Sequence, residues 1–460
     1  MRQSAKEDLG TTGSVSRRRL LQTTSALTLG TVGWLPKTVT AQSHGGTKDW
    51  NFETESSISS SPTVVDGTVF IGEEGGKLYA LDSESSDKLW EYQTDRRIIS
   101  SPAVVDGTVF IGSSDSFIYA VDAEDGTEKW RFETGSSIIS SPTVSDSTLF
   151  VGSEDNNLYA IDVESGSKKW TFEIMGRVNS SPVVVDETVF VGSIGYNIQA
   201  LNAKDGTQKW RFNITNSSSF SSPTVIDNTV FIGSAGADGG QISALNTEDG
   251  SKRWQFQTPD TVLSSPTVFD NTLFVGSGNI YDNIDENFIY ALNIENGNKK
   301  WEFETEAPVV SSPSIVENTL FVGTHPELDS GTANSGIYAI DTEDGTKVWE
   351  FETDGSVFSS PTIVDGTLFI GTLGGRVYAL DTGVEGSSDG SRVSQGTLGH
   401  HHEWAAQASK TRETTDYTNE NGIVDTGGLR DAVSDWQEGK IGADLLRRVF
   451  NAWQTGEPVE

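Results

Sequence analysis

The 460-residue sequence contains no cysteine. This absence excludes disulfides, thiolate metal sites, cysteine nucleophiles and a lipid-anchored N-terminal cysteine. Stability must therefore come from burial alone.

Basic residues are scarce: 32 Lys and Arg stand against 66 Asp and Glu, a net charge of −34. Phosphate binding needs clustered Lys and Arg, so nucleic acid is not expected as a partner, and neither is an anionic membrane surface. Self-repulsion keeps such a surface soluble, and high salt screens that repulsion. The composition resembles that of proteins from salt-loving archaea; an ordinary acidic secreted protein is the alternative.

The sequence also lacks an apolar run long enough to span a bilayer. Its most apolar N-terminal stretch, residues 26–35, follows Ser-Arg-Arg-Arg-Leu-Leu-Gln at 16–22 and precedes Val39-Thr40-Ala41. This is the three-part layout of a secretory signal, and the arginines resemble the twin-arginine motif. We expect a signal peptide over 1–41 and an exported protein, secreted or held at the cell surface.

A unit of about forty residues is repeated eight times between Trp50 and Thr382. Each copy carries a Ser-Ser-Pro, a glycine that closes the second apolar run, an Ala-apolar-Asp/Asn triplet and, in most copies, a final tryptophan. The prolines are Pro62, Pro102, Pro142, Pro182, Pro223, Pro266, Pro313 and Pro361.

Four short runs of strand character fill each unit. In the second unit they are 102–105, 108–112, 117–122 and 128–134, separated by turn signals such as Asp106-Gly107. Four antiparallel strands in about forty residues predict a β-propeller blade. The last unit ends without its fourth strand, and a spare fourth strand stands at residues 50–54. We predict an all-β, eight-bladed propeller over 42–382, closed by that N-terminal strand.

The repeated signature Trp-x-Phe-x-Thr … Ser-Ser-Pro-x-Val-x-Asp-Gly-Thr-Val-Phe-Ile-Gly … Ile-Tyr-Ala-Val-Asp is similar to the PQQ-like β-propeller repeat. That family includes quinoprotein dehydrogenases and BamB-type assembly factors. The resemblance implies that tryptophans dock each blade on the next: Trp50, Trp90, Trp130, Trp170, Trp210, Trp254, Trp301 and Trp349.

Resemblance to the repeat does not carry the enzyme's site with it. Many quinoprotein dehydrogenases clamp PQQ with adjacent cysteines, which this chain lacks, and no distinctive acid interrupts the inner strands. We expect a non-catalytic, monomeric scaffold that binds a protein partner and needs no cofactor. A PQQ-dependent dehydrogenase and an extracellular ligand or carbohydrate sensor are the alternatives.

Departures from the repeat point to candidate binding residues. Three units carry extra residues between their second and third strands, at 234–240, 277–287 and 324–336, and two links carry arginines. Exposed loops on a rigid scaffold often bind ligands, although tolerated insertions and local charge balancing explain the same features. The candidates are Arg96, Arg97, Arg177, Asp238, Asn279, Tyr281, Asp282, Asp285 and His325.

Residues 383–415 are rich in Gly, Ser and His and are expected to be a flexible linker. Residues 416–460 predict two amphipathic helices and resemble a dockerin-like or EF-hand-like module. Asn419, Asn421 and Asp425 fit ligand positions of a Ca²⁺ loop, but Tyr417 and Gly428 occupy two others. Weak Ca²⁺ binding and a metal-free docking hairpin both remain open, and the second is preferred.

Overall fold

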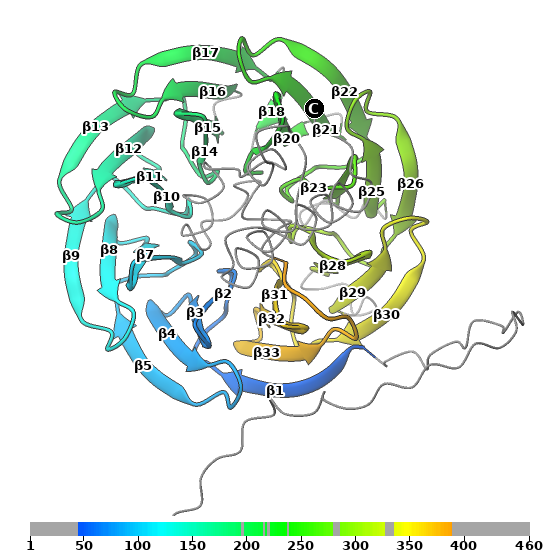
Figure 1. Cartoon of the computed structure of the whole chain (residues 1–460), viewed down its shortest axis with the longest axis horizontal. Coiled ribbons are helices and arrows are strands. Elements are labelled where there is room, and N and C mark those ends of the chain that lie inside the picture. Colours follow the sequence, from blue (N-terminus) through cyan, green and yellow to red (C-terminus); the bar gives the residue numbers. More distant parts are fainter. Residues whose placement is uncertain are drawn as a thin grey trace, which may run out of the picture. The chain divides into compact units, whose positions relative to one another are not determined.

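The computed structural model of the protein describes residues 45–194, 197–214, 217–218, 221–236, 239–278, 286–326 and 335–388. Strands of these ranges form eight antiparallel sheets arranged as blades around a ring, which confirms the predicted propeller (Figure 1).

In blades 1 to 4, chain order is also the order from the centre to the rim. Blade 1 is β2 (Thr63–Val65), β3 (Thr68–Gly72), β4 (Lys77–Asp82) and β5 (Lys88–Gln93). Blade 2 is β6 (Ala103–Val105), β7 (Thr108–Gly112), β8 (Phe117–Asp122) and β9 (Glu128–Glu133). Blade 3 is β10 (Thr143–Ser145), β11 (Thr148–Gly152), β12 (Asn157–Asp162) and β13 (Lys168–Glu173). Blade 4 is β14 (Val183–Val185), β15 (Thr188–Ser193), β16 (Asn197–Asn202) and β17 (Gln208–Asn213).

The remaining blades repeat the pattern with one addition, the short β18 (Ser217–Ser218) in blade 5. Blade 5 continues with β19 (Thr224–Ile226), β20 (Thr229–Gly236), β21 (Gly239–Asn246) and β22 (Lys252–Thr258). Blade 6 is β23 (Thr267–Phe269), β24 (Thr272–Gly276), β25 (Phe288–Asn293) and β26 (Lys299–Glu304). Blade 7 is β27 (Ser314–Val316), β28 (Thr319–Gly323), β29 (Gly336–Asp341) and β30 (Lys347–Glu352).

The closing blade joins the two ends of the repeat array. Its inner strands are β31 (Thr362–Val364), β32 (Thr367–Gly371) and β33 (Arg376–Asp381), and its outer strand is β1 (Thr47–Glu53). Trp50 lies opposite Ala379 and Glu53 lies opposite Arg376 in an antiparallel ladder. The N-terminal strand therefore supplies the missing fourth strand, as predicted.

The two serines of each Ser-Ser-Pro have different partners. In blade 2, the Ser100 hydroxyl donates to the carbonyl of Gly112 at 2.8 Å and accepts from its amide at 2.8 Å, which fixes the first strand to the second within the blade. The Ser101 hydroxyl instead accepts the backbone N–H of Ser61 in blade 1 at 3.0 Å. One serine therefore holds the blade, and the next joins neighbouring blades.

The inter-blade serine bonds run around the whole ring. Each second serine donates its N–H to the hydroxyl of the next, and Ser360 returns to Ser61 at 2.9 Å. The acceptors, in order, are Ser101, Ser141, Ser181, Ser222, Ser265, Ser312, Ser360 and Ser61. The repeated serines are thus occupied in closing the structure.

Replacing one of these serines by alanine is expected to lower stability measurably. Ser141→Ala removes the acceptor of the buried Ser101 N–H, which lies 2.9 Å away. Leaving a buried donor unsatisfied costs about 1–3 kcal/mol. Denaturant unfolding of the variant and of the natural chain measures the difference.

A neighbouring hydroxyl provides the control for this test. Thr143 donates to the carbonyl of Pro182 at 2.6 Å, but the equivalent positions of blades 2 and 4 are Ala103 and Val183, which have no hydroxyl. Thr143→Val should therefore cost less than Ser141→Ala. Equal losses would show that the serine ring has no special role.

The tryptophans contact the following blade. Trp90 Nε1 donates to the carbonyl of Ala123 at 3.0 Å, and a Cβ on Gly126 would lie 2.8 Å from the Trp90 ring. Gly126 has φ +75°, so both its conformation and this close approach favour glycine. Equivalent indole bonds occur at Trp50, Trp130, Trp170, Trp210, Trp254, Trp301 and Trp349.

The chain after Thr382 stays attached to the closing blade for six residues, where a flexible linker was expected. The Ser388 hydroxyl is buried and accepts the backbone N–H of Ile363 at 2.9 Å, and the Gly366 N–H donates to the carbonyl of Gly386 at 2.8 Å. These partners come from β31, through Ile363, and from the turn between β31 and β32, through Gly366. The expected signal peptide, the rest of the linker and the C-terminal module lie outside the described residues.

Candidate functional site

The propeller has two faces, and the repeat is interrupted on one of them. The link face carries the segments between blades and the loops between second and third strands; for example, Ser114 N donates to the carbonyl of Arg97 at 2.9 Å. The turn face carries the hairpin turns between first and second strands, such as Asp106-Gly107, and those between third and fourth strands.

The predicted arginines lie on the link face and are highly exposed. Arg97 Nη1 lies 3.6 Å from Glu74 Oε2, and Arg177 Nη1 lies 3.4 Å from Glu154 Oε1. The Arg96 side chain is exposed as well. The two ion pairs favour local charge balancing for Arg97 and Arg177, since each arginine faces a glutamate of a neighbouring loop.

Most of the predicted loop residues lie outside the described ranges. These are Asp238, Asn279, Tyr281, Asp282 and Asp285, together with the C-terminal Asn419, Asn421 and Asp425. The described residues of the insertion at 234–240 belong to strands, because β20 and β21 pair as far as Gly236 and Gly239, and β18 pairs with the end of β20. Part of the expected loop is therefore a lengthened hairpin.

His325 is the predicted candidate whose surroundings are best defined. It is buried, its ring meets the edge of Phe358 at 5.5 Å between centroids, and its backbone N–H donates to the carbonyl of Pro308 at 2.8 Å. Burial lowers the pKa of His325, which favours the neutral imidazole. Its Nδ1 atom has no hydrogen-bond partner among the described residues.

Three further buried polar atoms without a partner in the described part of the chain lie near the link face. Buried polar groups are usually satisfied, so each such atom needs an explanation. Sequence reasoning missed them because a repeat pattern does not show which polar side chains lack a partner. Asn179 and Gln199 have no amide at the equivalent positions of the other blades, whereas Asn287 has an equivalent in Asn156 of blade 3. The atoms are Asn179 Oδ1, Gln199 Oε1 and Asn287 Oδ1.

A partly apolar ring surrounds the axis on the link face. Ile98 packs at Gly72 and the Ser100 hydroxyl bonds Gly112, whereas the intervening Ile99 is half-buried just before the innermost strand of its blade. Phe358, at the same position in the closing blade, is 36% exposed. We call the described residues at this position the mouth set: Ser59, Ile99, Ile139, Asn179, Leu263, Val310 and Phe358.

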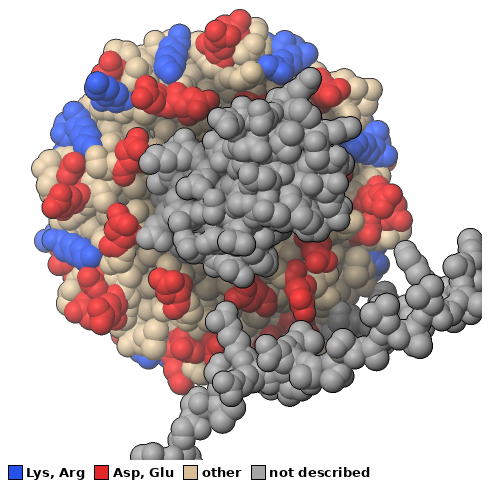
Figure 2. All heavy atoms as spheres, in the orientation of Figure 1, with Lys and Arg blue, Asp and Glu red and all other residues tan. Residues whose placement is uncertain are grey.

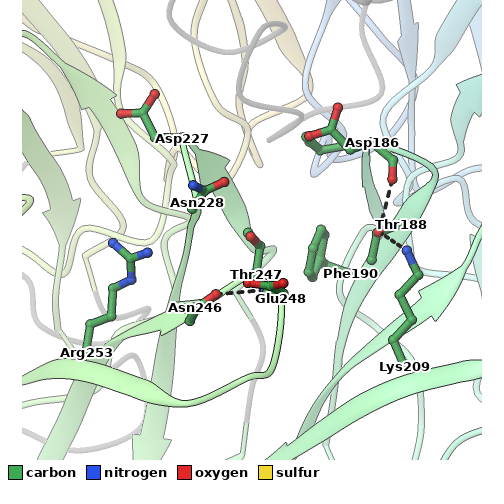
Figure 3. Close-up of a pocket in the computed structure, with 11 residues that line it drawn as sticks. Asp186, Thr188, Phe190, Lys209, Asp227, Asn228, Asn246, Thr247, Glu248 and Arg253 are labelled. Carbon is green, nitrogen blue, oxygen red and sulfur yellow. Dashed lines mark hydrogen bonds between the residues drawn. The ribbon is translucent and has the colours of Figure 1, made fainter.

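The turn face carries clefts between adjacent blades. The cleft between blades 4 and 5 has a volume of about 560 Å³ and holds Lys209 and Arg253 on opposite sides (Figure 3). Lys209 Nζ donates to Thr188 Oγ1 at 2.5 Å. Similar clefts recur between blades 1 and 2 and between the closing blade and blade 1, so this shape follows from the repeat.

Acidic side chains are spread around the face shown in Figure 2, whereas Lys and Arg lie toward its rim. Among the described residues, no group of three or more His, Asp or Glu side chains is arranged to hold a metal ion. The same part of the chain contains no helix with the length and apolarity of a membrane span.

Comparison with protein families finds two models on different parts of the chain. A model of the β-propeller of β-alanine-activating enzyme matches residues 58–282, and a model of the outer membrane protein assembly factor BamB matches residues 313–389. A laccase from Haloferax volcanii is 41% identical over 44 residues, which are 10% of this chain and 8% of that protein. The chain thus spans a small part of this relative.

Several solved structures share the fold at low identity. BamB from Moraxella catarrhalis has a TM-score of 0.61 at 18% identity, covering 73% of this chain and 99% of its own. A europium-containing methanol dehydrogenase has a TM-score of 0.60 at 14% identity, covering 73% and 93%. Quinohemoprotein alcohol dehydrogenase from Comamonas testosteroni has a TM-score of 0.59 at 15% identity, covering 74% and 76%. The two family models make parts of the chain similar to PQQ-like, BamB-type β-propellers, and the solved structures share its fold.

Proposed function

We propose that the protein is an exported, non-catalytic scaffold whose link face binds another protein. The observation that carries the proposal is the mouth set, where apolar side chains of several blades are left partly exposed around the axis. Met175, which is 62% exposed on the link between blades 3 and 4, adds a further apolar side chain to this face. Exposed apolar surface rimmed by polar groups marks interaction sites.

The arrangement of the apolar residues favours a protein partner over a small ligand. Ile99, Ile139 and Leu263 are half-buried and come from separate blades, so these apolar side chains are distributed over several blades of the link face. Arg97 and Arg177, each of which forms an ion pair with a glutamate, add polar groups on the same face. An apolar centre with a polar rim is the usual anatomy of a protein interface.

The described residues do not offer the donors that PQQ chemistry would need. The resemblance to quinoprotein dehydrogenases implies a metal ion held by a carboxylate beside PQQ, and no acidic cluster suited to a metal ion occurs in the described ranges. The inner hydroxyls that repeat around the ring, such as those of Ser100 and Ser101, already bond backbone groups. Within the described ranges, these observations support a scaffold that works without PQQ, and we derive no redox step.

An acidic substitution in the mouth set tests the proposal. Phe358→Asp should abolish capture of the partner that cross-links to the intact protein in its native host, because a carboxylate would have to be desolvated at the interface. Loss of a central aromatic anchor typically costs more than about 2 kcal/mol of binding, roughly a 30-fold change in Kd. Quantitative mass spectrometry after cross-linking measures the capture.

Val348→Asp is the matched control. Val348 is 47% exposed on β30, an outer strand away from the mouth set, so the same change of charge should leave capture intact. Equal capture by Phe358→Asp and the natural chain would contradict binding at the mouth. Turnover of an alcohol or sugar by the chain supplied with PQQ and Ca²⁺ would contradict the non-catalytic assignment.

A further inference from the structure

The residue directly before each tryptophan occupies a distinctive position in the outer strand. In blade 2, Trp130 pairs with Ala120 and Glu128 pairs with Val121, so Lys129 is the extra residue of a β-bulge. The same position is basic in five consecutive blades, from blade 2 to blade 6. These residues are Lys129, Lys169, Lys209, Arg253 and Lys300.

The bulge lysine joins the outer strand to the turn face of its own blade. Lys129 Nζ lies 3.0 Å from Asp122 Oδ2, 2.8 Å from Thr108 Oγ1 and 3.0 Å from the Gly107 carbonyl. The ammonium thus sits among a carboxylate, a hydroxyl and a carbonyl. Because these groups belong to the inner three strands and their turns, the lysine clamps the fourth strand in place.

Blade 3 repeats the clamp with the same three kinds of oxygen. Lys169 Nζ lies 3.3 Å from Asp162 Oδ2, 2.9 Å from Thr148 Oγ1 and 2.8 Å from the Ser147 carbonyl. The complete clamp thus occurs in two adjacent blades. In blades 4 and 6 the bulge lysine keeps the bond to the threonine hydroxyl, at 2.5 Å in each, while an asparagine replaces the aspartate.

In the closing blade, the bulge position that is basic in blades 2 to 6 is occupied by an acid. In β1, Lys48 pairs with Leu380 and Trp50 pairs with Ala379, so Asp49 is the bulge residue. The oxygens that would hold an ammonium there belong to Asp381, Thr367 and Gly366, and all three residues line one cleft with Asp49.

No base lines the clefts around Asp49. On the side of its own blade the cleft also contains Asp365 and Glu385, and on the side of blade 1 it contains Asp66 and Glu84; neither cleft is lined by a described Lys or Arg. Lys48, the nearest base in β1, donates to Asn51 Oδ1 at 3.1 Å. The seam therefore gathers like charge at the position where blades 2 and 3 have an ion pair.

The titration of Asp49 agrees with this geometry. Burial and the neighbouring Asp381 raise the pKa of Asp49 above its ordinary value. For an acid with a raised pKa, the charged form disfavours folding. The penalty is fully present above the folded-state pKa and disappears as the pH falls below the unfolded-state value.

We propose that the closing seam is a salt-dependent latch. Asp49 repels Asp381 and its acidic neighbours at low ionic strength, so the Asp49 end of β1 opens before the outer strands of the clamped blades. The Glu53–Arg376 ion pair, at 2.6 Å, holds the other end of β1, and dissolved cations strengthen closure at Asp49 by screening the repulsion there. The flanking blades add no clamp at the equivalent position, because blade 7 has Val348 and blade 1 has Leu89, both exposed. We therefore expect the pairing of β1 with β33 to open more readily than the pairing of the outer strand in the clamped blades.

Hydrogen–deuterium exchange of the full chain at about 0.1 M and about 2 M NaCl tests the latch. In the natural protein, amides of β1 should gain more protection from salt than amides of β9. Asp49→Lys should slow exchange of β1 about 2- to 5-fold at low salt, as an exposed ion pair allows, and much less at high salt. Asp49→Asn removes the repulsion without adding a pair and should give an intermediate result.

Lys129→Asp is the matched variant in an internal blade. It places two acids together at the bulge of β9, so it should make β9 as salt-sensitive as β1. Salt responses of β1 that are identical in the natural chain, Asp49→Lys and Asp49→Asn would overturn the proposal. So would a β9 strand that remains insensitive to salt in Lys129→Asp.

Discussion

A chain that begins at Glu55 is expected to lose at least about 5 kcal/mol of stability and its cooperative thermal transition, because it lacks β1. Trp50 and Phe52 pack against the core between the closing blade and blade 1, with ring centroids 5.8 Å from Phe369 of the closing blade and 5.6 Å from Tyr79 of blade 1. Removing one buried large aromatic costs roughly 3–5 kcal/mol, and the edge of β33 would also lose its partner. Such a loss approaches the whole stability of an ordinary domain.

Calorimetry of two truncated chains measures this effect. A chain that begins at Gly45 keeps β1 and is the control; we expect it to melt like the full-length protein. The chain that begins at Glu55 should melt far lower or without a cooperative transition. Equal melting temperatures for the two chains would mean that β1 is dispensable and that the ring is closed in another way.

The second large effect is a stabilisation. In the double variant Glu53→Cys/Arg376→Cys, a disulfide between β1 and β33 should raise stability by roughly 4–6 kcal/mol, because it closes a very long loop. The two residues are register partners, and Arg376 Nη2 lies 2.6 Å from Glu53 Oε1 across 323 positions of sequence. Covalent closure would prevent the opening of the seam.

The cysteine-free sequence makes this experiment simple to interpret, since the introduced pair is the only source of disulfides. The melting temperature of the oxidised variant should exceed that of the reduced variant, and each single variant should show no redox dependence. Failure to form the intramolecular bond, or formation of a disulfide-linked dimer alone, would contradict the pairing of β1 with β33.

The fold could be predicted from the sequence because local signals and the global period agree. Asp106 and Gly107 both adopt positive φ in the hairpin turn that the sequence predicted, because Asp and Gly tolerate this conformation. The strands on either side begin and end close to the predicted residues. The last repeat unit lacks its fourth strand, and a spare strand surrounds Trp50. Pairing the two is the arrangement that leaves no open sheet edge, so the closure of the ring could also be predicted.

The roles of the two serines could not be predicted in the same way. Ser100 and Ser101 are identical in the sequence, and only the path of the chain decides that one bonds within the blade and the other between blades. The repulsion between Asp49 and Asp381 could not be predicted for a similar reason. Its partner Asp381 lies at the far end of the repeat array, and no local pattern connects them.

The candidate site could be predicted only as a face of the molecule. Differences between repeats indicated the link face, but the mouth set arises from a position in the repeat that varies from Ser59 to Phe358. The exposure of Phe358 and the burial of His325 depend on how neighbouring blades meet around the axis. The sequence alone does not show which residues of neighbouring blades come together around the axis.

Hydroxyl-radical footprinting with and without the partner captured from the host tests most directly whether the link face is the binding surface. Met175 and Phe358 are exposed there and carry reactive side chains, whereas Leu89 and Val348 are exposed on outer strands. We predict that the partner reduces labelling of Met175 and Phe358 and leaves Leu89 and Val348 unchanged. Protection of Leu89 and Val348 alone would contradict binding at the link face.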